Sequence, residues 1–439
     1  MVLVSSALSP ETWPFSLKWL PDSACLVGGT VRDALLDRHS EYLDLDFVLP
    51  EGAVQTAQTI ARHYRAGFVV LDAERQIARV VFEQGTADFA QQVGSTLDAD
   101  LRRRDFTVNA IAYNPHTQQL LDPLRGYDDL QQKRLRMVSA DNLQEDPLRL
   151  LRAYRQAAQL GFSIEAQTQQ TIRQLAPQLR KIAAERVQSE LNYLLGATRG
   201  TSWLKTAWED GLLQDWLPSV TLDRLDRVVQ IDHVTARIQE TSTEFWAELN
   251  RSVRGTAQTS DTKTSGSVRT WVTIAKLATL LPIEPQSAEA QLWRLKYSRA
   301  EIQAVLTVVK SFPQLQQASL SAWTAAEQYF FFQKVGVAFS AIALLAMAEG
   351  SQEISQLVSR FLDSADPIAH PAPILTGQDL MSALHLPAGP RIGRLLAALQ
   401  LARAEGKITS RQDALDFAYT LLTLERSLGD ASSEPKARD

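Results

Sequence analysis

The stretch CLVGGTVRDALLDRHSEYLDLDFVLP, residues 25–50, constrains the fold of this chain more than any other part of its sequence. A short apolar run ends at Gly28 and Gly29, and the following TVRDALL has the apolar spacing of a helix start. A second apolar run, LDLDFVLP, carries Asp44 and Asp46 two residues apart. These patterns predict a strand, a glycine turn, a helix and a second strand, as in a domain that mixes strands and helices.

The two aspartates form a D-x-D motif with a direct geometric meaning. Residues two apart on a strand point to the same face, so we expect Asp44 and Asp46 to project side by side. Two carboxylates at that distance repel each other, so one should be protonated unless a cation lies between them, and Mg²⁺ prefers such hard oxygen ligands. D-x-D is also a common surface tripeptide, so the motif alone leaves a solvated strand face open as the alternative.

The glycine turn in front of the motif favours chemistry over that alternative. Gly28 and Gly29 allow the backbone to approach an anion and leave amide N–H groups free at a helix start. Arg32, on the first helical turn, can donate two hydrogen bonds to a phosphate. The combination describes a site for a nucleoside triphosphate with its metal ions, which would activate a hydroxyl and stabilise the leaving pyrophosphate.

The pattern along the chain changes once. Between residues 24 and 140 short β-like runs such as ACLVGG, ARVVFEQG and NAIAYNP alternate with helical stretches. From Glu145 onward the apolar residues follow helical spacing, and no strand is expected. The sequence therefore predicts an α+β head followed by an elongated all-α remainder.

Composition sets only broad limits. The net charge is −5, which neither indicates nor excludes a nucleic-acid ligand, because local basic patches decide phosphate binding. Cys25 is the single cysteine, so an internal disulfide is excluded and a buried thiol in a reducing cytosol is expected. No stretch reaches about 18 uninterrupted apolar residues, so we expect a cytoplasmic protein without a membrane span.

Several motifs occur in a recognisable order: GGTVRD with DLD, then LRRRDFTVNAIAY, then EDPLRLLRAYRQAAQLGF, and finally TGQDLMSALHLPAGPRIGRLLAAL from Thr376. In this order they resemble the class II tRNA nucleotidyltransferase and bacterial poly(A) polymerase family. The resemblance implies a nucleotidyltransferase-type mixed sheet with helices, followed by a neck, a body and a tail. The expected parts are the catalytic head 1–140, the nucleotide-reading neck 141–200, the body 201–350 with a flexible loop at 251–270, and the tRNA-binding tail 351–439.

The resemblance also implies roles for individual residues. Asp44 and Asp46 match the catalytic aspartates that bind two Mg²⁺ ions. The residues expected to bind the nucleotide are Gly28, Gly29, Arg32, Arg104, Asp105, Asn109, Asp146, Arg149, Arg152 and Arg155. Among them, Arg104 matches a triphosphate contact and Asp105 is expected near the ribose. The sequence leaves two interpretations of Asp88: a third carboxylate of the site, or an aspartate in an exposed loop.

Asp146, Arg149, Arg152 and Arg155 recur every three residues, which on a helix traces a spiral stripe rather than one straight face. The spacing alone equally describes a solvated face with i,i+3 charge pairs. The resemblance favours base reading, in which Asp146 accepts from the cytosine amine and Arg149 donates to its N3 and O2. Uracil reverses this pattern, and each unpaired group costs roughly 1 to 3 kcal/mol. UTP should therefore be rejected without a template, and the AERVQSEL segment with Glu185 and Arg186 is expected to brace the reading helix.

Two features bear on which member of the family this is. The segment between ADFA and DLRRRDF, residues 89–100, is short where CCA-adding and A-adding members have a longer flexible loop. Loss of this flexible loop is a mark of CC-adding members. The alternative is that the short connection has no effect on specificity. No GRRF-like segment follows the D-x-D motif, which argues against poly(A) synthesis.

We therefore expect an enzyme that adds CC to the tRNA 3′ end from CTP, without a template, and releases pyrophosphate. The alternative is a complete CCA-adding enzyme that uses CTP and ATP. A poly(A) polymerase and a non-catalytic tRNA-binding protein are less favoured, the latter because the motif residues are intact. A CC-adding enzyme implies an A-adding enzyme as its functional partner.

Overall fold

The computed structural model describes residues 6–38, 42–253, 269–317 and 319–431. The chain divides into two compact units. Among the described residues, the first comprises those up to Leu225 together with Gln291–Tyr297, and the second comprises those from Asp226 to Val253, Arg269–Ala290 and those from Ser298 onward. Most of the predicted flexible loop, residues 254–268, lies outside the described residues. The proposed division into head, neck, body and tail stays a prediction.

The first unit contains a seven-stranded mixed sheet with the order β3-β4-β5-β2-β1-β6-β7. Its strands are β1 Cys25–Val27, β2 Leu43–Leu49, β3 Gly67–Asp72, β4 Ile77–Phe82, β5 Gly85–Gln91, β6 Ala112–Asn114 and β7 Gln119–Leu121. The central pair β2·β5 is parallel, and the other neighbours are antiparallel. The predicted α+β head is confirmed.

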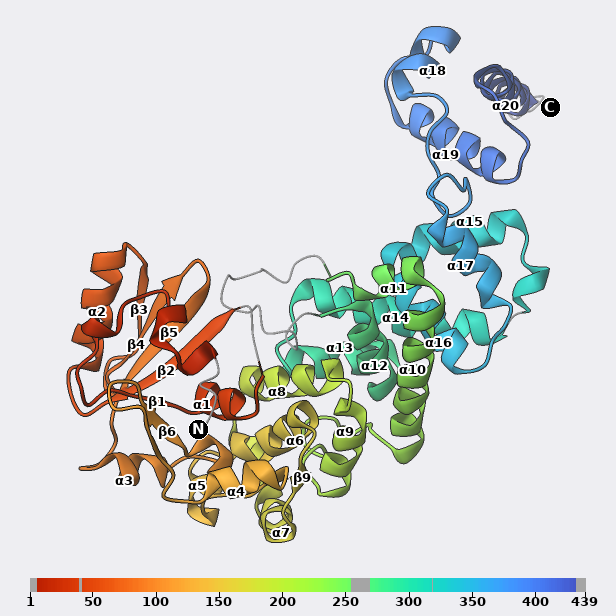
Figure 1. Ribbon diagram of the computed structural model, residues 1–439. Coiled ribbons are helices and arrows are strands. Elements are labelled where there is room, and N and C mark those ends of the chain that lie inside the picture. The colour runs from red at the N-terminus through yellow and green to blue at the C-terminus, as the bar shows by residue number, and fades with distance from the viewer. Residues whose placement is uncertain (1–5, 39–41, 254–268, 318, 432–439) are drawn as a thin grey trace, which may run out of the picture. The chain divides into compact units, whose positions relative to one another are not determined.

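One face of the sheet carries an apolar core. Leu45, Phe47 and Leu49 alternate along β2 and are almost completely buried. Phe47 stacks on Phe89 of β5 with ring centroids 5.3 Å apart. Helix α2, Ala53–Tyr64, lies against strands β3, β4 and β5 (Figure 1). The apolar residues of the D-x-D strand therefore face this core, which directs its aspartates to the other face.

The second face of the sheet carries a smaller apolar cluster at one end. There Cys25, Val27 and Val48 pack with Leu101 and Ala110. Cys25 is 6% exposed, which confirms the buried position expected for the single cysteine. The same face also carries the polar side chains of Asp44 and Asp46 on β2 and of Thr86 and Asp88 on β5.

The first unit contains further α-helices, of which α1 contacts β1 and β2 of the sheet and α8 and α9 pack with α6. They are α1 Gly29–Leu35, α3 Leu97–Leu101, α4 Gly126–Gln131, α5 Ala140–Glu145, α6 Leu148–Leu160, α7 Ala166–Leu175, α8 Ala184–Gly196 and α9 Gly200–Glu209. The expectation of no strand after Glu145 is wrong at one point, because β9 Ser163–Ile164 pairs with β8 Arg134–Leu135. A two-residue strand is too short to produce a periodic signal.

The second unit is built from helices. They are α10 Leu222–Thr241, α11 Thr243–Asn250, α12 Trp271–Leu280, α13 Pro285–Arg294, α14 Arg299–Gln317, α15 Ala325–Val335, α16 Phe339–Ala348, α17 Ile354–Leu362, α18 Gly377–Leu384, α19 Pro390–Ala404 and α20 Arg411–Ala431, of which α10 and α13 cross the boundary between the units. Within the described residues, the stretch Ala325–Ala348 is the one long and apolar enough to cross a membrane, and 67% of its most apolar window is buried. Gly336, with φ of 51°, separates α15 from α16 in this stretch. The stretch therefore has the burial of a core element.

The last three helices of the second unit share an apolar cluster of their own, and Figure 1 shows α18, α19 and α20 together. Leu380, Leu395 and Ala414 are among its buried members. Local polar contacts define the helix starts: Thr376 and Asp379 form a reciprocal capping box at α18. We call α18–α20 the C-terminal bundle.

Candidate active site

The two aspartates of the D-x-D motif lie on the sheet face opposite the Phe47 side of β2. Asp44 pairs in register with Thr86 of β5, and Asp46 pairs with Asp88. Thr86 Oγ1 donates a hydrogen bond to Asp44 Oδ1 at 2.5 Å. Because both aspartates belong to one continuous strand, the prediction that they share a strand face is confirmed.

Asp88 is a strand residue of the site face and does not lie in an exposed loop. Its side chain is 19% exposed, and its register partner on β4 is Arg79. Arg79 donates two hydrogen bonds to the Asp88 carboxylate, from Nε at 2.7 Å and from Nη2 at 2.9 Å. Asp88 therefore lies beside Asp46 with its negative charge already paired.

The surroundings of Asp46 disfavour its ionised carboxylate. Burial removes hydration from its carboxylate, and the charges of Asp44 and Asp88 add repulsion, which together raise the pKa of Asp46 to about 7. Arg104 and Arg152 oppose this rise through their positive charges. A divalent cation between Asp44 and Asp46 would offset both the lost hydration and the repulsion.

The donor set fits a divalent ion that is completed by its substrate. Within the part of the chain that the structure describes, no group of three or more His, Cys, Asp and Glu side chains is arranged to hold a metal. Asp44 and Asp46 would therefore supply only part of a coordination sphere. Mg²⁺ is commonly bound by one or two carboxylates, with water and substrate phosphates as the remaining ligands.

The glycine turn lies directly against these carboxylates. Gly28 has φ of 72°, a conformation that side chains rarely adopt. A Cβ at this position would lie 3.5 Å from Asp46 Oδ2 and 3.3 Å from Arg104 Nη1. Helix α1 begins at the next residue, Gly29. The predicted strand, turn and helix are confirmed, and Gly28 joins Asp46 and Arg104 in one site.

Arg32, Asn109, Asp105 and Arg152 form a continuous polar network beside the turn. Arg32 Nη1 donates to Asn109 Oδ1 at 2.7 Å, and Asn109 Nδ2 donates to Asp105 Oδ1 at 2.9 Å. Asp105 Oδ2 forms an ion pair with Arg152 Nε at 2.9 Å. Burial alone would raise the pKa of Asp105, but Arg152, Asn109 and the Phe106 amide outweigh it and lower that pKa. The structure thus connects four of the residues expected to bind the nucleotide.

Asp146 lies before the predicted reading helix and not on it. It has extended backbone angles and ends α5, whereas α6 begins at Leu148. The reason is Pro147, which disfavours a helical conformation in the preceding residue. The Asp146 carboxylate forms a two-pronged ion pair with Arg186 of α8, at 3.2 and 2.8 Å. The expected spiral stripe therefore begins at Arg149.

The three arginines of α6 have different surroundings. Arg149 Nη1 donates to the backbone carbonyls of Arg103 and Asn142, at 3.1 and 2.8 Å. Arg155 is directed to α8, where its Nε lies 2.5 Å from the buried Glu190 and its guanidinium lies over the Tyr193 ring. The structure brings Arg152 to Asp105 and places Arg155 in a separate buried ion pair.

Several residues at the site were not singled out from the sequence. They are Thr86, Arg79, Asp100, Asn142, Gln156 and Glu190, which hydrogen-bond or pair with predicted site residues. The alternation of Thr86 and Asp88 with apolar neighbours is a strand signal that could have identified Thr86. The i,i+4 spacing of Asp100 and Arg104 could have identified that pair. Glu190 lies 35 residues from its partner, and no local pattern identifies it.

Family models cover most of the chain. Residues 24–136 match the poly A polymerase head domain, which contains the carboxylates and the glycine turn. Residues 161–223 match the RNA and SrmB-binding site of polymerase A, and residues 267–418 match tRNA nucleotidyltransferase domain 2.

Individual relatives match the chain over nearly its whole length. It is 48% identical to the CC-adding tRNA nucleotidyltransferase of Synechocystis sp., over 93% of this chain and 96% of the relative. It is 33% identical to the A-adding tRNA nucleotidyltransferase of Deinococcus radiodurans, over 90% and 95% of the two chains. A solved CCA-adding enzyme in complex with CTP has a similar fold, with a TM-score of 0.69 at 21% identity over 91% of each chain. This chain is a nucleotidyltransferase that belongs to the class II tRNA nucleotidyltransferase and poly(A) polymerase family.

Proposed function

We propose that this protein adds two cytidines to the 3′ end of tRNA, with CTP as the donor, no nucleic-acid template and release of pyrophosphate. The observation that carries the proposal is the connection between β5 and α3, which comprises only residues 92–96. The similarity to the CC-adding relative from Synechocystis sp. supports the same specificity.

Hydrogen bonds hold this connection at several points. The Gln92 amide donates to the Leu49 carbonyl at 2.7 Å, and the Val93 amide donates to Asp100 Oδ1 at 3.0 Å. Thr96 Oγ1 accepts from the Ala99 amide at 3.2 Å and caps α3. A short segment with this many bonds has little freedom to rearrange around a larger base. We therefore expect the site to stop after the second cytidine and to exclude ATP.

The proposed chemistry uses Asp44 and Asp46 to hold two Mg²⁺ ions. Enzymes of this family generally use divalent metal ions, and bound Mg²⁺ would stabilise charge on the attacking 3′ hydroxyl and the leaving pyrophosphate. The Gly28 backbone and the Arg104 guanidinium, both beside Asp46, would bind the triphosphate. Arg32, Asn109 and the other members of their network would fix the ribose end of the nucleotide.

Base selection is assigned to Asp146 and Arg149. The Arg186 pair fixes the Asp146 carboxylate, whose oxygens keep further lone pairs for the cytosine amine. Both bonds from Arg149 use Nη1, so Nη2 is available to donate to the cytosine acceptors. This arrangement selects cytosine over uracil by hydrogen-bond polarity, with protein groups in the role of a template.

A CC-adding enzyme leaves tRNA without its terminal adenosine. We therefore also propose a separate A-adding enzyme as the functional partner, with both activities in the cytoplasm. The relative from Deinococcus radiodurans is an A-adding enzyme of the same family, which supports the division of this chemistry between two proteins.

The test uses purified protein, Mg²⁺ and a transcribed tRNA that lacks its 3′ CCA. CTP and ATP are supplied together, and products are resolved to one nucleotide. Extension by two residues that then halts supports the proposal, whereas extension by three assigns the complete CCA-adding activity instead. No extension by a folded protein that still binds the tRNA would contradict both assignments. The Asp44→Asn variant serves as the inactive control, and tRNA ending in CC with ATP tests A addition separately.

A further inference from the structure

Two aspartate–arginine pairs with the same spacing lie at α3. Asp98 and Arg102 form an i,i+4 ion pair at 2.7 Å, and Asp100 and Arg104 form another at 3.3 Å. The first pair is exposed, with side-chain exposures near one half. The second pair is largely buried: the exposed fraction of the side chain is 24% for Arg104 and 10% for Asp100. The same local spacing thus gives one solvated pair and one pair that faces the site.

The Asp100 carboxylate joins two parts of the head. Its Oδ1 accepts the Val93 amide of the 92–96 connection at 3.0 Å, and its Oδ2 contacts Arg104 Nη2 at 3.3 Å. One buried carboxylate therefore bonds the short connection on one side and a site arginine on the other. Displacement of either partner would leave this carboxylate with an unpaired oxygen, which is unfavourable in a buried position.

Arg104 is placed for an anionic ligand. A Cβ on Gly28 would lie 3.3 Å from its Nη1 and 3.5 Å from Asp46 Oδ2, so the guanidinium lies beside the D-x-D carboxylates. Its Nε is buried and has no hydrogen-bond partner among the described residues. An arginine that keeps an unused donor next to the carboxylates is suited to a phosphate oxygen.

We propose that Asp100 is a positioning residue that holds Arg104 in place for the β- and γ-phosphates of the incoming nucleotide and couples that position to the 92–96 connection. The inference rests on the proposed function, since it assigns the triphosphate of CTP to Arg104. Asp100 makes no contact with substrate in this role and acts through the arginine.

The Asp100→Asn variant tests this, with Asp98→Asn as the matched control. The asparagine oxygen can still accept the Val93 amide, so the fold is retained while the charge that orients Arg104 is lost. We expect the KM for CTP to rise about 10-fold, with the KM for tRNA within twofold of wild type, because one charge-assisted contact to phosphate is weakened. Asp98→Asn should leave both constants unchanged.

Two further measurements separate positioning from general support of the fold. Equilibrium binding should weaken for CTP and not for CMP, which lacks the phosphates that Arg104 is proposed to meet. In an Arg104→Ala background, Asp100→Asn should add no further loss of CTP affinity. Two results would overturn the inference and give Asp100 a purely structural role. One is an equal loss of CTP affinity in the wild-type and Arg104→Ala backgrounds, and the other is an equal loss of affinity for CMP and CTP.

The outcomes also separate this inference from the proposed function. If wild type adds cytidines and Asp100→Asn has the same KM for CTP as Asp98→Asn, the inference fails and the function stands. If wild type adds no nucleotide, the function fails, and CTP binding decides the inference: weaker binding by Asp100→Asn supports it, and equal binding overturns it.

Discussion

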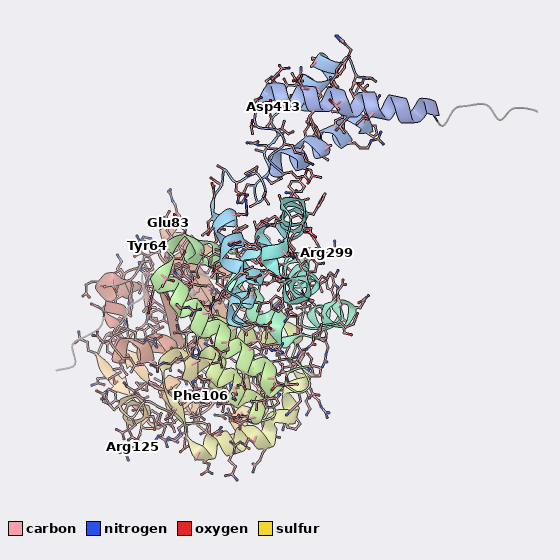
Figure 2. All side chains as sticks on the ribbon, turned by 90° about the vertical axis from the view of Figure 1, so that its right-hand side faces the viewer. Tyr64, Glu83, Phe106, Arg125, Arg299 and Asp413 are labelled. Carbon is pink, nitrogen blue, oxygen red and sulfur yellow. The ribbon has the colours of Figure 1, made fainter. Side chains whose placement is uncertain are left out.

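The site face of the sheet and the C-terminal bundle use charged residues in opposite ways. At the site, several partners are distant in sequence and poorly exposed, as in Arg32 with Asn109, 77 residues apart. In the bundle, the contacts that cap helix starts join residues three or four apart on the surface. One example is Asp413 near the beginning of α20 (Figure 2), which accepts the amides of Thr409 and Ser410. The first arrangement places charge where a ligand binds, and the second fixes where helices begin.

The difference predicts which substitutions affect chemistry and which affect stability alone. Removal of a site charge should change catalysis, and where the charge is buried without a full set of partners its removal can even stabilise the fold. Removal of a bundle charge should cost stability without changing the chemical step. The following predictions are ordered from the largest expected effect to the smallest.

Asp44→Asn should lower kcat for cytidine addition at least about 1000-fold, because the variant loses one of the two carboxylates that hold the metal ions. The thermal midpoint should stay within a few degrees of wild type. Single-turnover addition to tRNA measures the effect. Asp379→Asn in the C-terminal bundle is the control and should keep kcat within twofold; a comparable loss of kcat there would remove the distinction between the two regions.

Asp46→Asn should stabilise the metal-free protein in a pH-dependent way. The pKa of Asp46 is raised from 3.8 in the unfolded chain to about 7 in the fold, so the folded state resists its ionisation. The wild type therefore loses stability relative to the variant as pH rises from about 4 to about 7, by at most about 4 kcal/mol, and the difference is constant above that range.

Urea unfolding in chelator at pH 5, 7 and 8.5 measures this difference. Added Mg²⁺ should reduce it, because the ion binds only the wild-type carboxylate pair well. If the variant were less stable than wild type at pH 8.5 in chelator, that result would contradict the raised pKa of Asp46.

Arg155→Met should destabilise the first unit by about 3 kcal/mol, because it leaves Glu190 buried without its ion-pair partner. The Glu190 side chain is only 8% exposed. Urea unfolding followed by tryptophan fluorescence gives the value. The double variant Arg155→Met with Glu190→Leu should recover much of the lost stability. If Arg155→Met alone were as stable as wild type, the Arg155–Glu190 ion pair would be solvated.

Thr376→Ala should lower the stability of the C-terminal bundle by about 1 kcal/mol, because the capping box at α18 loses its hydroxyl. Thr376→Ser keeps the hydroxyl and should retain most of the stability. Thermal unfolding provides the measurement, and kcat measured below the transition should not change. A change in kcat with Thr376→Ala would mean that the bundle takes part in the chemical step.

Local patterns predicted the parts of the site that depend on one segment. The shared face of Asp44 and Asp46 follows from the period of a strand, and the turn at Gly28 follows from the paired glycines. The same kind of local evidence corrects one error, since Pro147 directly after Asp146 indicates that the helix begins later. The helical remainder was predicted equally well, because amphipathic spacing is repeated over many turns.

Partners that meet only after folding could not be predicted in this way. Arg186 contacts Asp146 from another helix, 40 residues along the chain, and Arg32 reaches Asn109 across 77 residues. These contacts depend on how the helices and strands pack in the folded chain, which the hydrophobic periodicity of a single element does not encode. The nucleotide-binding roles of Arg149 and Arg152, and the number of bound metal ions, remain predictions.

The parallel register of β2 and β5 makes enzymatic activity a measure of correct folding. Asp88 and Phe89 are adjacent on β5 and point to opposite faces, so a slip of one residue would place Phe89 beside Asp46 and direct Asp88 into the aromatic core. A head with that slip would have neither a filled core nor a site. Specific activity after refolding should therefore count the molecules in which these two strands found their native alignment.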